Sequence, residues 1–169
     1  QIQIMAKPNA LLPAEQSRGR RPRIAGHPPA PHPMIMYLHG FRSAPTSTKD
    51  RLLHTRLQQQ GLGDRLWCEQ LAVSPRQAID QVEAAIAAQD GKPVLIGSSL
   101  GGYYATYLAE KHDLRAILIN PATYADRTLQ PWIGTHTNLY TGETFAFTGR
   151  HIEELKALAV PTLRQPSRV

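Results

Sequence analysis

Cysteine is nearly absent from this chain, because Cys68 is the only one among 169 residues. The chain therefore forms no internal disulfide and offers no cysteine-based zinc site. This usage is typical of a reducing compartment. No apolar run of about 18 residues occurs, as a transmembrane helix would need, and residues 1–12 lack the charged-then-apolar order of a signal peptide. We therefore predict a cytoplasmic protein that does not enter a membrane.

Net charge is absent from the central part of the chain. The formal net charge is +6, but residues 1–33 hold five basic side chains against Glu15, and the last six residues add Arg164 and Arg168. Residues 34–163 therefore carry no net charge. A basic face on the folded part is not expected, so we predict no nucleic-acid partner for it.

Residues 1–33 have the composition of a tail. Seven of the 14 prolines lie there, and the run over residues 28–33 is incompatible with a regular helix or a central strand. We predict a disordered, solvated extension. The basic run at residues 18–23 could instead contact RNA or an acidic surface, and natural translation could begin at Met34. At the other end, residues 164–169 read as a polar segment.

From Met34 onward, short apolar runs alternate with segments of helical periodicity. Ser74, Pro75 and Gln77 have the order of a helix start with a capping box. Residues 122–149 read as loop. The strands are predicted at 34–38, 66–71, 93–97 and 116–119, and the helices at 49–60, from 75 to about 90, at 100–111 and at 150–159. This order is the signature of an α/β fold, with a parallel sheet and helices on both faces.

One motif carries chemistry: Gly97-Ser98-Ser99-Leu100-Gly101 matches G-x-S-x-G. It follows a predicted buried strand and opens a predicted helix, which is the setting of a nucleophile elbow. Ser99 would be the nucleophile, and Gly97 and Gly101 would give the room that strand and helix backbones need where they approach. The alternatives are a tight turn without catalysis and a phosphate-binding loop, although the lysine of a P-loop is missing.

A second segment, His39-Gly40-Phe41, ends the first predicted strand. An acyl-transfer site needs two backbone N–H donors for the oxyanion. The amides of Phe41 and Leu100 are placed for this role. We interpret His39 as a histidine that orders this loop rather than as a catalytic one. Arg42 could contact an anionic substrate, or could simply be solvated.

These motifs resemble the YqiA-like esterases, which are small bacterial enzymes of the α/β-hydrolase fold. The resemblance runs from Met34 to about Leu163. It rests on Tyr37–Phe41 with Ser43, Pro45, Ser47 and Lys49, on Gly97–Thr106, on Asn120–Ala122, on Tyr140–Gly142 and on Arg150-His151. The resemblance implies a serine esterase that acts on short acyl esters or thioesters, with Ser99 as its nucleophile. No metal and no cofactor is expected.

The acid and the base of a catalytic triad are not identified in the sequence. In this fold they follow the serine in the order Asp or Glu, then His. The resemblance implies an acid in a Gly-Asp-Glu-like stretch and a histidine in a Gly-Gly-x-His-like stretch near the C-terminus, and this chain has neither. We therefore expect a partial α/β-hydrolase domain over residues 34–163, with a truncation or a frame change near Arg164 and its C-terminal strands missing.

Local residues are poor substitutes for the missing pair. His112 and Asp113 end the helix that begins at the elbow, and about 12 residues of helix would carry them about 18 Å from Ser99. Asp126 and His136 have the right order, but no predicted strand end holds them. His151 is better placed for a structural or substrate-facing role. A metal site of His136, Glu143 and His151 lacks helical ligand spacing.

Two functions from different classes remain open. The first is a serine ester hydrolase whose chain holds the nucleophile and the oxyanion hole. The alternative is a non-catalytic, hydrolase-like binding module or the product of a decayed gene. In either case the fourth strand would leave an open parallel edge, so we predict that the chain is poorly soluble or forms oligomers.

Overall fold

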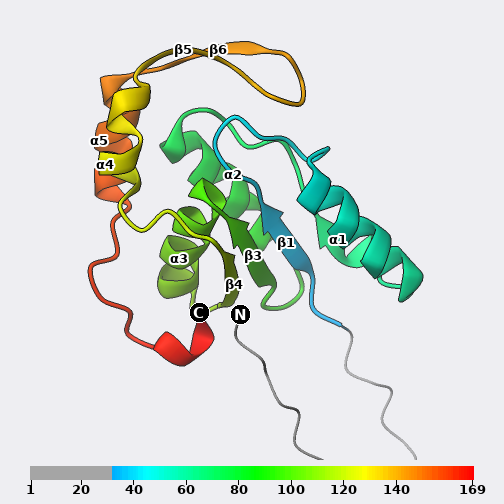
Figure 1. Ribbon diagram of the computed structural model, residues 1–169. Coiled ribbons are helices and arrows are strands. Elements are labelled where there is room, and N and C mark those ends of the chain that lie inside the picture. Colours follow the sequence, from blue (N-terminus) through cyan, green and yellow to red (C-terminus); the bar gives the residue numbers. More distant parts are fainter. Residues whose placement is uncertain (1–31) are drawn as a thin grey trace, which may run out of the picture. The chain divides into compact units, whose positions relative to one another are not determined.

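The chain alternates strands and helices in the order that the sequence predicts (Figure 1). A computed structural model describes residues 32–169, so the predictions for residues 1–31 lie outside the described residues. The strands are β1 (Ile35–Leu38), β2 (Leu66–Trp67), β3 (Val94–Ser98), β4 (Arg115–Ile119), β5 (Gly134–Thr137) and β6 (Thr144–Phe147). The α-helices are α1 (Thr48–Gln59), α2 (Pro75–Ala87), α3 (Leu100–His112), α4 (Ala125–Thr128) and α5 (Gly149–Ala157).

The main sheet is parallel and has the strand order β2-β1-β3-β4. Its central strands, β1 and β3, read as nearly continuous apolar runs because both of their faces meet other parts of the protein. Met36, Leu38 and Leu95 have no exposed surface. They form the core with the inner faces of α2 and α3.

Helices lie on both faces of this sheet, as predicted. Successive side chains of a strand point to opposite faces, and the end of β3 shows both. Gly97 packs against the start of α3, whereas the Ser98 hydroxyl accepts a hydrogen bond from Lys49 Nζ of α1 at 3.0 Å. Figure 1 accordingly shows α1 on the opposite side of the sheet from α3.

The start of α2 is only partly as predicted. Pro75 is its first residue, and the Ser74 hydroxyl accepts a hydrogen bond from the Gln77 amide at 3.3 Å. The predicted return bond from the Gln77 side chain is absent from residues 32–169, so the capping box is only half formed. The Ser74 hydroxyl instead donates to the carboxylate of Glu154 at 2.7 Å, which ties α2 to α5.

Two further elements differ from the sequence prediction. The second strand, β2, ends at Trp67 instead of continuing to residue 71. Beyond it, Cys68 donates to the carboxylate of Asp50, and Gln70 and Leu71 turn toward His39. The segment 122–149 is not simply loop, because it holds α4, a short 3-10 helix at Gln130–Trp132 and the antiparallel hairpin β5–β6.

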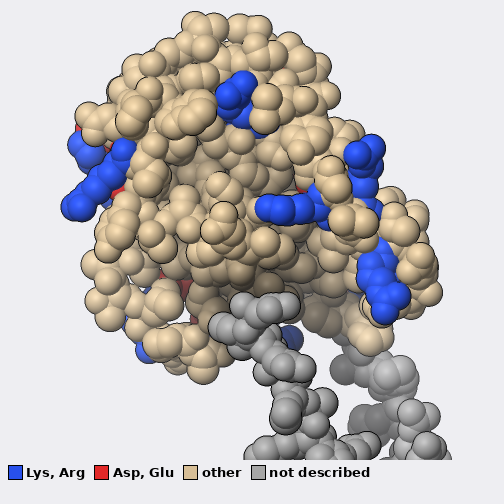
Figure 2. Space-filling model, viewed as in Figure 1, with Lys and Arg blue, Asp and Glu red and all other residues tan. Residues whose placement is uncertain are grey.

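The outer strand β4 leaves one edge and one face of the sheet open in the described part of the chain. Ile117 is 54% exposed and Ile119 is 37% exposed, and Ile119 pairs with Ser98, whose side chain lies on the α1 face of the sheet. Figure 2 shows basic side chains along α1 and near α4 and α5, with an uncharged surface between them. On this face β4 exposes Ile117 and Ile119 together with Arg115.

The last six residues pack along α3. The Arg164 guanidinium pairs with the Glu110 carboxylate at 3.0 Å, and Arg168 pairs with Asp113 at the end of the helix. Val169 contacts the apolar core. Within residues 32–169, no helix combines the length and the apolar character that crossing a bilayer requires.

Candidate functional site

Ser99 occupies the turn between β3 and α3 in a conformation that serine rarely adopts. Its φ is 54° and its ψ is −118°, and the residue is exposed. A side chain forced into a sparsely populated backbone region of this kind costs about 1–3 kcal/mol, which the surrounding packing must offset. Strain of this kind concentrates at functional sites. The turn is sharp because α3 begins at the very next residue, Leu100.

Glycines surround this turn where backbones approach most closely. A Cβ at Gly97 would lie 2.6 Å from the Cα of Gly102. On the other side, a Cβ at Gly40 would lie 3.2 Å from the Ser99 Cβ and 3.6 Å from its hydroxyl oxygen. Gly101 faces the end of β1 in the same way. The structure thus brings together residues 39–41 and 97–101, the two segments from which the site was predicted.

Two backbone amides beside Ser99 remain without a partner. Within residues 32–169, the N–H groups of Phe41 and Leu100 donate to no backbone or side-chain acceptor. Leu100 is the first residue of α3, where the helix dipole favours negative charge. Phe41 follows Gly40, where a Cβ would lie 3.2 Å from the Ser99 Cβ. An oxygen anion formed at Ser99 would therefore find unused donors nearby.

His39 is buried and fully engaged, so it is not available as a base for Ser99. Its Nδ1 bonds to the Gly40 carbonyl oxygen at 3.1 Å, and its Nε2 accepts the Leu71 amide at 3.0 Å and the Gln70 side-chain amide at 3.3 Å. This pattern requires the proton on Nδ1. Burial lowers the pKa of His39, which keeps the ring neutral. Its contacts order the loop.

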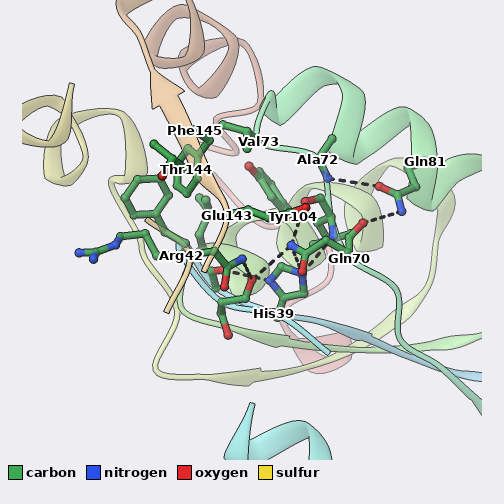
Figure 3. Close-up of a pocket in the computed structure, with 16 residues that line it drawn as sticks. His39, Arg42, Gln70, Ala72, Val73, Gln81, Tyr104, Glu143, Thr144 and Phe145 are labelled. Atoms are coloured by element: carbon green, nitrogen blue, oxygen red, sulfur yellow. Dashed lines mark hydrogen bonds between the residues drawn. The ribbon is translucent and has the colours of Figure 1, made fainter. Parts of the chain in front are cut away.

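A cavity of about 510 Å³ opens beside these segments (Figure 3). Ser99 is not among its lining residues, but Gly40, Phe41 and Leu100 are. Its walls combine apolar side chains with amides and two charged groups. In addition to Gly40, Phe41 and Leu100, the lining residues are His39, Arg42, Ser43, Gln70–Val73, Gln81, Tyr104, Asn138 and Glu143–Phe145. A space of this size and mixture suits a small organic ligand.

The remaining candidates for an acid or a base lie apart from Ser99 or are already bonded. His112 pairs with Glu83 at 2.6 Å at the end of α3. His151 accepts the Thr148 amide at 3.1 Å and so caps α5. Among residues 32–169, no side chain makes a hydrogen bond to the Ser99 hydroxyl. Asp126 and His136 are not hydrogen-bonded to each other, because His136 bonds to the Trp132 carbonyl oxygen.

His136 lies on β5, and its ring contacts the ring of Phe41. The two ring centroids are 5.6 Å apart, and the His136 Nε2 bonds to the Trp132 carbonyl oxygen at 2.5 Å. His136 therefore belongs to the wall around Phe41.

A second polar cluster lies on the α1 face of the sheet. The carboxylate of Asp50 is buried and bonds to Ser47 and Cys68. Burial and the hydrogen bond to Asp50 raise the pKa of the Cys68 thiol well above its usual range, so this thiol is not a nucleophile at neutral pH. No group of three or more His, Cys, Asp or Glu side chains in the described range 32–169 is placed to hold a metal ion.

Sequence reasoning missed the residues that the hairpin and the segment after β2 bring to the site. Gln70 bonds to His39, Asn138 bonds to the loop after β1, and Phe145 contacts the Phe41 ring. The alternation Thr144-Phe145-Ala146-Phe147 was a signal for β6. Nothing comparable marks β5, whose four residues are Gly, Thr, His and Thr.

Comparison with known proteins identifies a family for this chain. The model of the Uncharacterised protein family (UPF0227) matches residues 34–169. A UPF0227 protein of Shewanella woodyi is 26% identical over 93 residues, which cover 52% of this chain and 50% of that protein. The chain thus spans about half the length of this curated relative.

Two solved structures show the same architecture. A presumed hydrolase from Agrobacterium vitis S4 aligns with a TM-score of 0.62 at 20% identity, covering 76% of this chain and 62% of that one. Alpha/beta hydrolase domain-containing protein 10 from mouse aligns with a TM-score of 0.50 at 18% identity, with the same coverage of both chains. At these identities the likeness establishes the α/β-hydrolase fold.

Proposed function

Because the chain belongs to the UPF0227 family and has an α/β-hydrolase fold, we propose that it is a serine hydrolase of small carboxylic esters or thioesters. The observation that carries the proposal is the strained, exposed backbone of Ser99 between β3 and α3. A nucleophile elbow needs this conformation, because it lifts the hydroxyl clear of the sheet. A merely structural turn would not need a serine at positive φ.

In the proposed reaction, the Ser99 oxygen attacks the carbonyl carbon of the substrate. A new C–O bond forms, and the carbonyl oxygen becomes an anion held by the amides of Phe41 and Leu100. The intermediate then collapses and the C–O or C–S bond to the leaving group breaks. The leaving group departs as an alcohol or a thiol with the proton that the Ser99 hydroxyl gave up, and the acyl group stays on Ser99. Water hydrolyses this acyl-enzyme in a second step. Gly97, Gly101 and Gly40 leave room for the turn.

The cavity beside Phe41 and Leu100 supports an acyl substrate of modest size. Its volume is about 510 Å³, within the usual range for small-molecule sites. Phe41, Leu71 and Phe145 offer apolar contact, while Gln70 offers an amide group. We propose that the acyl chain occupies this space. No cofactor takes part in this reaction.

A second candidate function is favoured by a separate observation. The Ser99 hydroxyl has no hydrogen-bonded base within residues 32–169, so the described part does not itself supply the general base that activates a serine. A hydrolase-like fold without a base would bind an acyl or anionic ligand without turning it over. This binding module is the alternative to the enzyme.

Covalent labelling with a fluorophosphonate probe separates the two functions. We expect the full chain to be labelled, the Ser99→Ala variant to lose the label, and the matched Ser98→Ala variant to keep it, because the Ser98 hydroxyl is buried and bonded to Lys49. Labelling at Ser99 would send the search for the base first to His136 and His151. Folded protein that takes no label would contradict the hydrolase proposal and leave the binding module.

A further inference from the structure

The side chain of Phe41 lies in a ring of aromatic groups that come from the segment 130–147. Trp132, His136, Phe145 and Phe147 meet the Phe41 ring edge-on, with centroid separations of 6.2, 5.6, 5.7 and 5.0 Å. Edge-to-face pairs of this kind are favourable beyond the area that they bury. Side chains of the β5–β6 hairpin therefore pack around Phe41, the residue whose amide lies beside Ser99.

The backbone after Phe41 is bonded to the same hairpin. The Arg42 Nε donates to the Thr137 carbonyl at 3.0 Å, and the Leu139 amide donates to the Arg42 carbonyl at 3.0 Å. Arg42 itself has a φ of 57°, which is strained for an arginine. A loop with this conformation needs outside contacts to hold it, and the hairpin supplies them.

Asn138 joins the two parts most directly. Its side-chain oxygen accepts the amides of Tyr140 and Thr141 at 2.9 and 3.2 Å, which fixes the turn of the hairpin. Its side-chain nitrogen donates to the Ser43 carbonyl at 2.9 Å, which fixes the end of the loop. The residue is only 7% exposed. The buried side-chain amide of Asn138 thus fixes the position of the loop relative to the hairpin.

We propose that Asn138 is a positioning residue for the oxyanion hole, and this inference rests on the proposed function. The segment 40–43 is a closed turn, with the Ser43 amide bonded to the Gly40 carbonyl at 3.2 Å. Holding Ser43 and Phe41 from the hairpin side therefore fixes the direction of the Phe41 amide. A misplacement of about 1 Å at a catalytic group can cost about 100-fold in rate.

The test is the Asn138→Asp variant, because aspartate keeps the oxygen that accepts from Tyr140 and Thr141 but loses the donor to Ser43. The matched control is Thr141→Val, which removes a hydroxyl bonded only to Glu143 within the turn. For the fluorophosphonate reaction at Ser99, the maximal rate of inactivation and the half-saturating concentration are measured separately. We expect Asn138→Asp to lower the maximal rate about 10- to 100-fold, with half-saturation within about twofold, and Thr141→Val to match the wild type.

Hydrogen exchange of the Ser43 amide gives a readout that needs no chemistry at Ser99. We expect it to quicken about tenfold or more in Asn138→Asp, while core amides such as that of Leu155 stay protected. If Asn138→Asp does not fold, Asn138→Ser carries the same comparison, because serine keeps a side-chain oxygen that can accept within the same turn but loses the amide that donates to Ser43.

The outcomes separate the two proposals. An unlabelled wild type would overturn the proposed function, and the exchange of the Ser43 amide alone would then decide whether Asn138 holds the loop. A labelled wild type whose maximal rate is unchanged in Asn138→Asp would overturn the positioning role and leave the hydrolase intact. A rise in half-saturation with an unchanged maximal rate would assign Asn138 to binding and contradict the inference.

Discussion

The backbone of Gly101 lies directly against the end of β1, where a Cβ at Gly101 would come within 2.7 Å of the His39 carbonyl oxygen. Both partners are main chain, so neither can rotate away. The same contact holds the first turn of α3 against the strand that leads to Phe41. Because Gly101 carries a hydrogen atom where alanine would carry a methyl group, Ser99 and the loop after β1 can lie this close together.

This relationship predicts that Gly101→Ala destabilises the protein by about 3 kcal/mol or more, because overlap with backbone in a packed core cannot relax. Gly149→Ala is the matched control. Gly149 is the first residue of α5, nothing lies within 4 Å of its Cβ position, and alanine favours a helix by up to about 1 kcal/mol. Urea denaturation of both variants measures the difference. Equal stabilities would refute the close-contact argument.

The strained backbone at Ser99 predicts that a glycine at this position makes the protein more stable than an alanine does. Glycine adopts positive φ without a penalty, so Ser99→Gly should be about 1 kcal/mol more stable than Ser99→Ala, although glycine also loses more entropy on folding. Both variants lack the hydroxyl, so the comparison isolates the backbone. Thermal or urea unfolding checks it. A glycine variant that is less stable than the alanine variant would show that the turn carries no strain.

The buried ring of His39 predicts a pH dependence of stability. Burial lowers the pKa of His39 below its unfolded value, so the unfolded chain binds the extra proton first as the pH falls. The contribution of the neutral ring is therefore full above about pH 6.5 and is lost progressively as the pH falls toward the folded pKa.

The matching variant is His39→Asn, which cannot titrate. We expect the free energy of unfolding of the wild type to fall more steeply than that of the variant between pH 7 and pH 5. The variant should lose about 1–3 kcal/mol at pH 7, since the Leu71 amide loses its acceptor. Parallel pH profiles for the two proteins would contradict the assignment of a neutral His39.

The open edge of β4 predicts self-association of this chain. Ser99 donates its amide to the Ile119 carbonyl, so the backbone groups of Ala116 and Leu118 point away from β3. A second copy running antiparallel could pair with them. We expect sedimentation velocity to show association that grows with concentration and that Ile117→Lys reduces.

Leu139→Lys serves as the control for this effect. Leu139 is 68% exposed, more than Ile117, but it lies at the hairpin turn instead of on β4. The Leu139→Lys variant should therefore associate to the same extent as the wild type. A wild type that stays monomeric at every concentration tested would rule out pairing through β4.

The parallel sheet could be predicted from the sequence because its strands carry the pattern that their surroundings require. Residues 34–38 and 93–97 are apolar at almost every position, and a strand buried on both faces needs that composition. The turn at Ser99 was visible for the same reason: small residues are required where Gly97 and Gly101 meet neighbouring backbone. Local chemistry and global fold agree at these positions.

The hairpin could not be predicted in the same way. Residues 134–137 are polar and mostly exposed, so no burial pattern marks them as a strand, and their partner at 144–147 is what makes them one. The role of Asn138 depends on contact with Ser43, which is 95 residues away in the chain. A contact over that distance leaves no periodic trace in the sequence.

The two parts that meet at Phe41 also differ in how quickly they can form. The β5–β6 hairpin pairs residues close together in the chain, as Thr137 with Thr144, and such hairpins form within microseconds. The sheet must bring Ile35 to Val94, a non-local pairing that slows folding. We expect the hairpin to form before the sheet that positions Phe41. Docking of Phe41 among the hairpin aromatics is then a late event in folding, and the change in Trp132 fluorescence that accompanies it would time the assembly of the site.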